Sequence, residues 1–287
     1  MATSNTITPA EVYSRAIDEK YRQLSKTAFL ETDSILVHPQ GAGTIKIPKL
    51  NLDGTVGTYS TTTGFAKAFI KQEYQEVEKD IDLSIQVGAD YVENLDGSGI
   101  AFNAGTKLAS DLFIPVIDAL RISSICQKAG ITTKDDTFTT GNTVITALRT
   151  ATVAMANKSV PQENRVTFIL PEIIGMLNDM DSYKSKQILT ELGKIVVVTP
   201  NIFYTKAELD SKQPAGYKKS EGAKDINFLI LDKNAVMAKT AVRTKIFSAD
   251  QNPNLDEDVM QIRQFGLSAY VLDNKIDSVY VSTKPTA

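Results

Sequence analysis

The sequence predicts an α+β fold, and three observations lead to this prediction. Residues 102–130 form one long stretch in which apolar side chains recur at helical spacing. Residues 44–48 and 81–87 alternate between apolar and polar side chains, which is typical of half-buried strands. Beyond residue 130, helical patterns are interspersed with short apolar runs that indicate buried strands. Since a long apolar helix needs cover on several sides, we expect a sheet or other subunits to pack around it.

The composition is that of an ordinary globular protein. The chain has 287 residues, of which 42% are hydrophobic and 23% charged, so it can bury a substantial core. A net charge of −3 gives no basic footprint, which excludes tight sequence-specific binding to DNA or RNA. The sequence has no apolar run of the roughly 18–20 residues that a membrane span requires, and residues 1–10 lack the core of a signal peptide. We therefore expect a protein that is made and used under cytosol-like conditions.

The counts of cysteine and histidine limit the chemistry. One cysteine, Cys126, allows no internal disulfide, and its place on the apolar side of a predicted helix indicates a buried hydrophobe rather than a nucleophile. One histidine, His38, stands in a polar connector and cannot build a histidine-rich metal site. Residues 97–105 contain glycines before a helix, but they match neither the dinucleotide nor the Walker pattern. The sequence therefore predicts no catalytic, cofactor-binding or metal-binding residues and no cofactor.

The first elements are a helix and a hairpin. A capping box with Pro9 at the first helical position begins a helix that continues to about Ala28. The alternating strands at 44–48 and 81–87 predict a hairpin, and its tip has only Leu52, Val56 and Tyr59 as sizeable apolar residues. A two-stranded ribbon alone is marginal in water, so this hairpin must lie on the edge of its own sheet or across another subunit.

The long helix has recognisable ends and one interruption. Asn103 or Thr106 can cap its start, and Gly130 can adopt the left-handed conformation of a C-terminal cap. The helix would then run about 24 residues, or roughly 36 Å. Pro115 lies inside it and predicts a kink, because a mid-helix proline costs about 3 kcal/mol. The apolar stripe contains Leu108, Leu112, Ala119, Ile122 and Cys126.

The C-terminal half alternates between helices and strands. The predicted helices are 142–158, a helix that begins at Pro171, and 183–192; the predicted strands are 165–170, 194–199, 227–231, 243–247, 265–272 and 276–281. We expect 207–225 to be a charged loop, 235–238 an apolar turn and 248–258 an acidic loop. Residues 273–275 should form the turn of a final hairpin.

Several of these stretches carry motifs. The long helix contains I-P-x-x-D-A-x-R, and V-P-x-x-x-R-V and P-E follow in the predicted strand and helix after it. With these motifs the chain resembles the major capsid proteins of tailed bacteriophages, whose fold is named after phage Hong Kong 97 and is here called HK97-like. The matching residues are Ile114, Pro115, Asp118, Ala119, Arg121, Val160, Pro161, Arg165, Val166, Pro171, Glu172, Pro200, Arg263, Phe265, Gly266, Asp273, Asn274 and Lys275.

The resemblance implies a division of the chain. Residues 1–40 would be an N-terminal arm and 41–90 an extended hairpin, the E-loop, which lies over a neighbouring subunit. Residues 91–130 with 241–265 would form the peripheral domain with its spine helix, and 131–240 with 266–287 the axial domain. For the N-terminal helix, an ordinary amphipathic helix packed on its own domain remains open. For 207–225, both a loop at a capsomer centre or rim and a solvated insertion remain open.

The resemblance also implies a function. The chain would be a structural protein, not an enzyme, that self-assembles through pentamers and hexamers into an icosahedral shell around a dsDNA genome. Its partners would be itself, a separate scaffolding protein, a portal, a maturation protease and DNA in weak non-specific contact, without a membrane. It would assemble in the host bacterial cytoplasm and reside in the virion. Covalent crosslinking is not predicted, although Lys67, Lys71, Asn252 and Asn254 are available.

Two other functions remain as alternatives. An encapsulin-type nanocompartment shell resembles the same fold but encloses enzyme cargo, and a cargo enzyme encoded beside this gene would favour it. A soluble enzyme is the remote alternative, because no pair of titratable residues stands out. An enzyme should elute as a small oligomer, whereas a capsid protein should elute as capsomers or particles.

Overall fold

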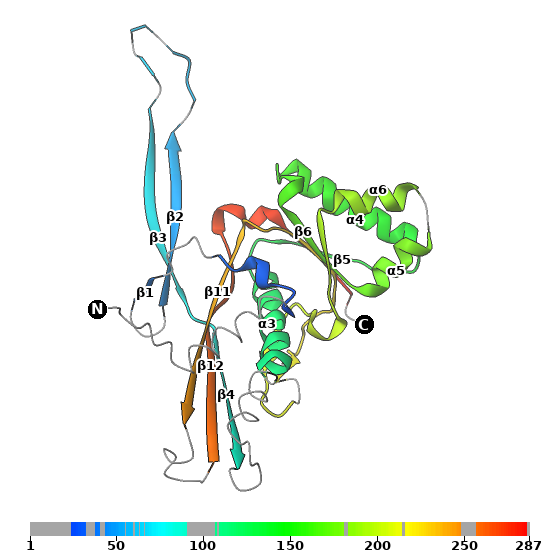
Figure 1. Ribbon diagram of the computed structural model, residues 1–287. Coiled ribbons are helices and arrows are strands. Elements are labelled where there is room, and N and C mark those ends of the chain that lie inside the picture. Colours follow the sequence, from blue (N-terminus) through cyan, green and yellow to red (C-terminus); the bar gives the residue numbers. More distant parts are fainter. Residues whose placement is uncertain are drawn as a thin grey trace, which may run out of the picture.

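The computed structural model describes residues 24–32, 38–40, 44–54, 56–59, 61–62, 64–65, 67–90, 107, 109–180, 183–213, 216–247 and 257–285. Figure 1 shows three regions around one helix. A hairpin projects from the body, a three-stranded sheet lies beside the helix, and a larger sheet with its own helices lies on the other side. None of the described helices is long and apolar enough to cross a membrane.

The larger sheet has five strands in the order β5-β13-β10-β6-β7. The central strands β13 (Val279–Thr283), β10 (Ile226–Asp232) and β6 (Arg165–Ile169) are buried along their whole length, in agreement with their high apolar content. The edge strands β5 (Thr132–Asp135) and β7 (Lys194–Val197) pair in parallel with β13 and β6. Helices α4 (Gly141–Asn157), α5 (Pro171–Asp179) and α6 (Tyr183–Glu191) pack together beside this sheet (Figure 1). The helices predicted here and the strands predicted at 165–170, 194–199 and 227–231 are confirmed.

The smaller sheet is antiparallel, with β12 (Glu257–Val271) between β11 (Val236–Phe247) and β4 (Ile81–Asp90). Burial along β4 follows the expected period of two. Ile81 is buried toward the central helix, whereas Asp82, Ser84 and Gln86 are exposed. The prediction of an apolar turn at 235–238 is wrong, because β11 begins at Val236 and continues to Phe247, with an irregularity in its pairing between Met237 and Lys239.

The hairpin is built from β2 (Thr44–Gly54) and β3 (Ala68–Glu78), with β1 (His38–Gln40) paired to the start of β2. The prediction that residues 44–48 pair with 81–87 is therefore wrong, since 81–87 belong to β4 and pair with β12. All three strands β2, β3 and β4 have side chains that alternate between two faces, and this alternation alone does not determine which strands pair with one another. The hairpin itself is confirmed, with its tip at 55–67 and its base at Lys79 and Asp80 (Figure 1).

The central helix is interrupted just before Pro115. A π-helical turn (Ala109–Phe113) precedes α3 (Ile114–Cys126), so Pro115 is the second residue of α3 rather than the middle of a bent helix. Proline is tolerated in the first turn of an α-helix, where the N–H that it lacks has no α-helical partner. The expected caps at Asn103 and Thr106 lie outside the described residues. Gly130, with a φ of 90°, lies in the turn after the helix rather than at its cap.

Two further predictions in the C-terminal half are wrong. Residues 207–225 are not one loop, because β8 (Ala207–Leu209) and β9 (Tyr217–Lys219) form a small hairpin whose Ala207 and Tyr217 are buried. Residues 265–281 are not a hairpin either. A short helix (Asp273–Ser278) separates β12 from β13, and the two strands belong to different sheets. The acidic loop expected at 248–258 lies almost wholly outside the described residues.

Candidate assembly site

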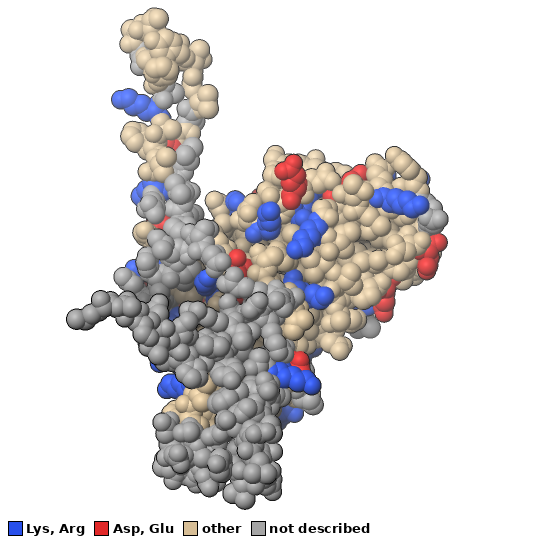
Figure 2. Space-filling model, viewed as in Figure 1, with Lys and Arg blue, Asp and Glu red and all other residues tan. Residues whose placement is uncertain are grey.

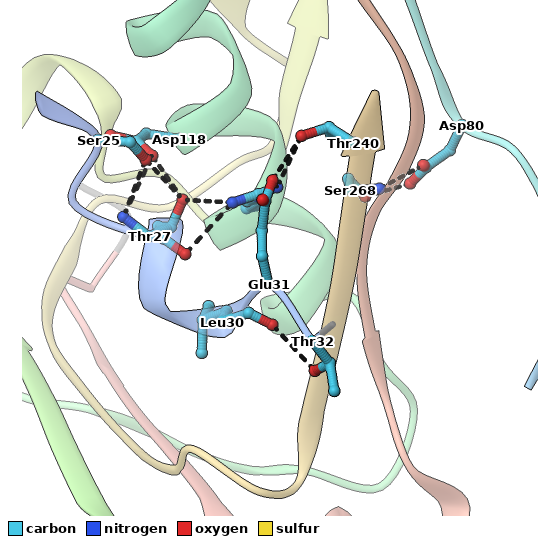
Figure 3. Close-up of polar contacts among 10 residues, drawn as sticks. Ser25, Thr27, Leu30, Glu31, Thr32, Asp80, Asp118, Thr240 and Ser268 are labelled. Atoms are coloured by element: carbon cyan, nitrogen blue, oxygen red, sulfur yellow. Dashed lines mark hydrogen bonds and ion pairs between the residues drawn. The ribbon is translucent and has the colours of Figure 1, made fainter. Parts of the chain in front are cut away.

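The motif residues Asp118 and Arg121 lie on α3 and face the segment 24–32, here called the arm root. Asp118 is buried, and its carboxylate accepts hydrogen bonds from the hydroxyl of Ser25 (2.6 Å) and the backbone N–H of Lys26 (2.9 Å) (Figure 3). Thr27 adds its hydroxyl at 2.5 Å and its backbone N–H at 3.3 Å. The carboxylate thus receives donors from three consecutive residues, as an N-terminal helix cap does, and holds this turn of chain against the helix.

Arg121 extends the same cluster to β11. Its side chain is fully buried, and its guanidinium donates to Glu31 at 2.6 Å and to the carbonyl oxygen of Thr27 at 3.2 Å. The hydroxyl of Thr240, on β11, donates to the same Glu31 oxygen at 2.5 Å and accepts from Arg121 at 3.3 Å. The arm root, α3 and β11 are therefore joined by one buried ionic network, here called the arm-root cluster (Figure 3).

A second cluster fixes the base of the hairpin. Asp80, between β3 and β4, accepts hydrogen bonds from the backbone N–H of Ser268 (2.6 Å), from the Ser268 hydroxyl and from the Ser124 hydroxyl (3.3 Å). The Ser268 and Ser124 hydroxyls lie 2.7 Å apart. Ser124 belongs to α3 and Ser268 to β12, so the point where the hairpin leaves the body is tied to both elements. Asp80, Ser268 and Ser124 are here called the hinge cluster, and Figure 3 shows Asp80 and Ser268 beside the arm-root cluster.

A third set of contacts lies where α3 ends. Lys128 donates to Asp273 at 2.5 Å and to the hydroxyl of Tyr270 at 3.2 Å, and its ammonium lies 4.4 Å from the Tyr270 ring centre. Gln75, on β3, donates to the same hydroxyl at 2.5 Å. Burial opposes the charge of Lys128, but its hydrogen bonds to Asp273 and Tyr270 outweigh burial and raise its pKa. The hydrogen bond from Lys128 in turn lowers the pKa of Asp273. The end of the helix, the hairpin and the turn after β12 are thereby connected.

The remaining residues that the sequence analysis singled out do not belong to these three clusters. Cys126 is partly buried against the main core, and burial raises the pKa of its thiol to about 12. His38 lies in β1, paired with Lys46. Lys67 and Lys71 are exposed on the hairpin, whereas Asn252 and Asn254 lie outside the described residues. Within the described ranges, no group of three or more His, Cys, Asp or Glu residues could hold a metal ion.

The hairpin carries an exposed apolar surface that sequence reasoning underestimated. Of the eleven large apolar side chains that are exposed in the described part of the chain, six lie on it, so most such surface belongs to one projecting element. At the tip, Tyr59 and Phe65 are 59% and 82% exposed, with ring centres 5.0 Å apart. Figure 2 shows the tip as an uncharged surface. The six residues are Val56, Tyr59, Phe65, Phe69, Ile70 and Tyr74.

Comparison with known structures identifies the fold. The capsid of Cyanophage P-SCSP1u aligns with a TM-score of 0.56 at 17% identity, covering 90% of this chain and 87% of that chain. The mature capsid of bacteriophage PhiM1 aligns at 0.57 and 12% identity, covering 88% and 84%. A virus-like particle from Pyrococcus furiosus aligns at 0.53 and 12% identity, covering 96% and 100%. No protein-family model and no curated protein sequence matches the chain. The chain has the HK97-like capsid fold, as its motifs predicted.

Proposed function

We propose that this chain is the major capsid protein of a tailed bacteriophage or prophage and that it assembles through pentamers and hexamers into an icosahedral shell around dsDNA. The observation that carries the proposal is the projecting hairpin. It exposes six large apolar side chains to solvent in the isolated subunit, and this concentration of exposed apolar residues on one element favours an interaction site. A second subunit can cover this surface, since the hairpin points away from its own body (Figure 1).

The arrangement around α3 supports the same function. The arm-root and hinge clusters hold the segment 24–32 and the base of the hairpin on one helix, so the hairpin leaves the subunit in a defined direction. Contacts that are individually weak multiply when every subunit in a closed shell makes them. The proposal includes the division into arm, hairpin, peripheral and axial domains. It also includes a scaffold, a portal and a protease as partners, weak contact with DNA, assembly in the bacterial cytoplasm and residence in the virion.

The test separates folding from assembly at the hairpin tip. Gly54 and Ala68 are paired across β2 and β3, so a two-residue Asn-Gly turn can replace residues 55–67 without changing the strand register. We expect this variant to melt like the wild type, because the side chains described in this range are exposed, and to stop at monomers or capsomers. A full-length control with Thr61→Ser and Thr62→Ser should still form particles. Closed shells from the shortened protein in electron micrographs would contradict the proposal.

An encapsulin-type compartment is the second candidate. The observation in its favour is the similarity to the archaeal virus-like particle, whose chain is covered over its full length. The content of particles purified from the native host distinguishes the two functions. A packaged genome gives nuclease-protected DNA, whereas a compartment gives a second protein in fixed ratio to the shell protein.

A further inference from the structure

The smaller sheet has an exposed face on the side turned away from α3. Alternate residues of β12 point to opposite faces: Ile262 is buried in one cluster with Ile114 and Ile117 of α3, whereas Gln261 and Arg263 are exposed. A hollow of about 420 Å³ lies on the exposed face. Its six exposed lining residues, here called the basic face, are Ser84 and Gln86 on β4, Arg243 and Lys245 on β11, and Gln261 and Arg263 on β12.

Positive charge is concentrated on the basic face. Three of its six residues are cations and none is an acid. The carboxylate of Asp82 adjoins the face and accepts two hydrogen bonds from Arg263, one of them from Nε at 2.7 Å. Within the described part of the chain, Arg243 and Lys245 have no acidic partner. Three cations less one carboxylate leave two positive charges on this face, although the whole chain has a net charge of −3.

The register of the sheet makes this arrangement unfavourable for an isolated subunit. Arg243 on β11 lies directly opposite Arg263 on β12, and Lys245 lies opposite Gln261 in the neighbouring pair. Like charges directly opposite one another destabilise a sheet. Asp82 neutralises one of the two arginines, so repulsion from Arg243 and Lys245 remains. An anion that binds beside these two side chains would remove it.

The donors on the basic face match phosphate groups. Guanidinium and ammonium groups only donate hydrogen bonds, and Gln261 donates its amide to the Gln86 oxygen at 3.1 Å, which directs the NH₂ group of Gln86 to other acceptors. None of the six residues is apolar, whereas stable protein interfaces have an apolar centre. Exposed arginine and lysine side chains of this kind contact the phosphates of nucleic acids without reading the sequence.

We propose that the basic face contacts the phosphate backbone of double-stranded DNA inside the closed shell, so that this side of the smaller sheet lines the interior. The inference rests on the proposed function and names the surface that meets the genome. Contact through Arg243 and Lys245 is weak in one subunit and independent of sequence, in agreement with the chain's lack of an overall basic footprint. Every subunit of the shell repeats it, so the weak contacts add up.

The salt dependence of DNA binding by the unassembled subunit tests the contact. Two phosphate contacts per subunit predict a slope of about −1.8 for log K against log salt concentration, or roughly a 12-fold loss of affinity between about 50 and 200 mM salt. The double variant Arg243→Gln with Lys245→Gln should lose most of this slope on a mixed-sequence duplex. The matched control, Lys184→Gln with Lys186→Gln, removes the same charge from α6 and should keep the slope.

Two results of this titration would overturn the inference. One is a slope that persists in the Arg243 and Lys245 double variant, or that falls equally in the control, because binding would then not depend on this face. The other is a double variant that loses binding to a poly-aspartate peptide but keeps binding to DNA, because the partner would then be an acidic protein surface. All four substituted side chains are exposed, so both variants should melt like the wild type.

Chemical modification of wild-type particles tests the orientation of the face. Full and empty particles are treated with a small amine-reactive ester, and the modification of each lysine is measured by mass spectrometry. We expect Lys245 to lose reactivity in full particles relative to the other exposed lysines, because DNA covers it. Equal modification of Lys245 in full and empty particles would overturn this inference and leave the proposed function intact. If no particles contain nuclease-protected DNA, the proposed function itself fails.

Discussion

The arm-root cluster permits a quantitative prediction through Arg121→Met. The arginine is fully buried, and its partner Glu31, 2.6 Å away, has a side chain that is only 6% exposed. Methionine keeps the apolar length of the side chain but leaves the Glu31 carboxylate buried beside Thr240 without a cation. Removing one partner of a buried ion pair costs about 3–5 kcal/mol. This is a large share of the roughly 5–15 kcal/mol by which folded domains are stable.

Thermal unfolding of the unassembled subunit measures this loss. A melting temperature shift of roughly 6–20 °C follows, at about 2–4 °C per kcal/mol for a domain of this size class. The matched control is Arg263→Met, which breaks the exposed pair with Asp82. Solvent screens that pair, so its loss should shift the melting temperature far less. A double variant, Arg121→Met with Glu31→Met, should recover much of the stability because no buried charge remains unpaired.

Two results would refute the reasoning. One is an Arg121→Met variant that melts as high as the Arg263→Met control, which would mean that Glu31 is solvated in solution. The other is a double variant that is less stable than the single one, which would mean that the network gains more from its charges than their burial costs.

Three further predictions concern stability. Gly266→Ala should lower the free energy of unfolding, measured by denaturant titration, by about 1–3 kcal/mol or more. Gly266 has a φ of 151°, and a Cβ there would lie 2.2 Å from a backbone oxygen of β11. Gly175→Ala is the control, because open space surrounds this position inside α5, and alanine there should leave stability unchanged or raise it slightly. Asp273→Asn should lower stability at neutral pH but not in acid. The pKa of Asp273 is depressed in the folded state, so its carboxylate stabilises the fold above the unfolded-state pKa of about 3.8 and loses this effect as the pH falls further. An equal loss of stability at both pH values would exclude the ion pair as the cause. Replacing only 211–213 with glycine and serine should leave the melting temperature unchanged, whereas deleting 207–219 should lower it because buried residues are lost. Equal effects of the two changes would show that the β8–β9 hairpin does not pack against the rest of the subunit.

The sequence by itself determined the elements whose cause is local. The helix α4 follows from an apolar face at Val144, Leu148, Ala151 and Met155, and all four are buried. Continuous apolar runs marked the central strands of the larger sheet. Proline at 115 indicated an interruption of the long helix, and the structure gives that interruption the form of a π turn. Charged residues at 118 and 121 inside an apolar helix were visible as part of a motif, and that pattern alone could have indicated a buried polar cluster.

Only the tertiary structure decided which elements meet. Alternation predicted strands at 44–48 and 81–87 correctly but paired them wrongly, because the period of two is local and carries no information about a partner. The partners of Asp118 and Arg121 come from segments about 90 and 119 residues away in the chain. Ser25, Glu31 and Thr240 are ordinary polar residues in the sequence. Their role arises only when folding brings them beside the buried charges of α3, where an unpaired charge would cost more than the network does.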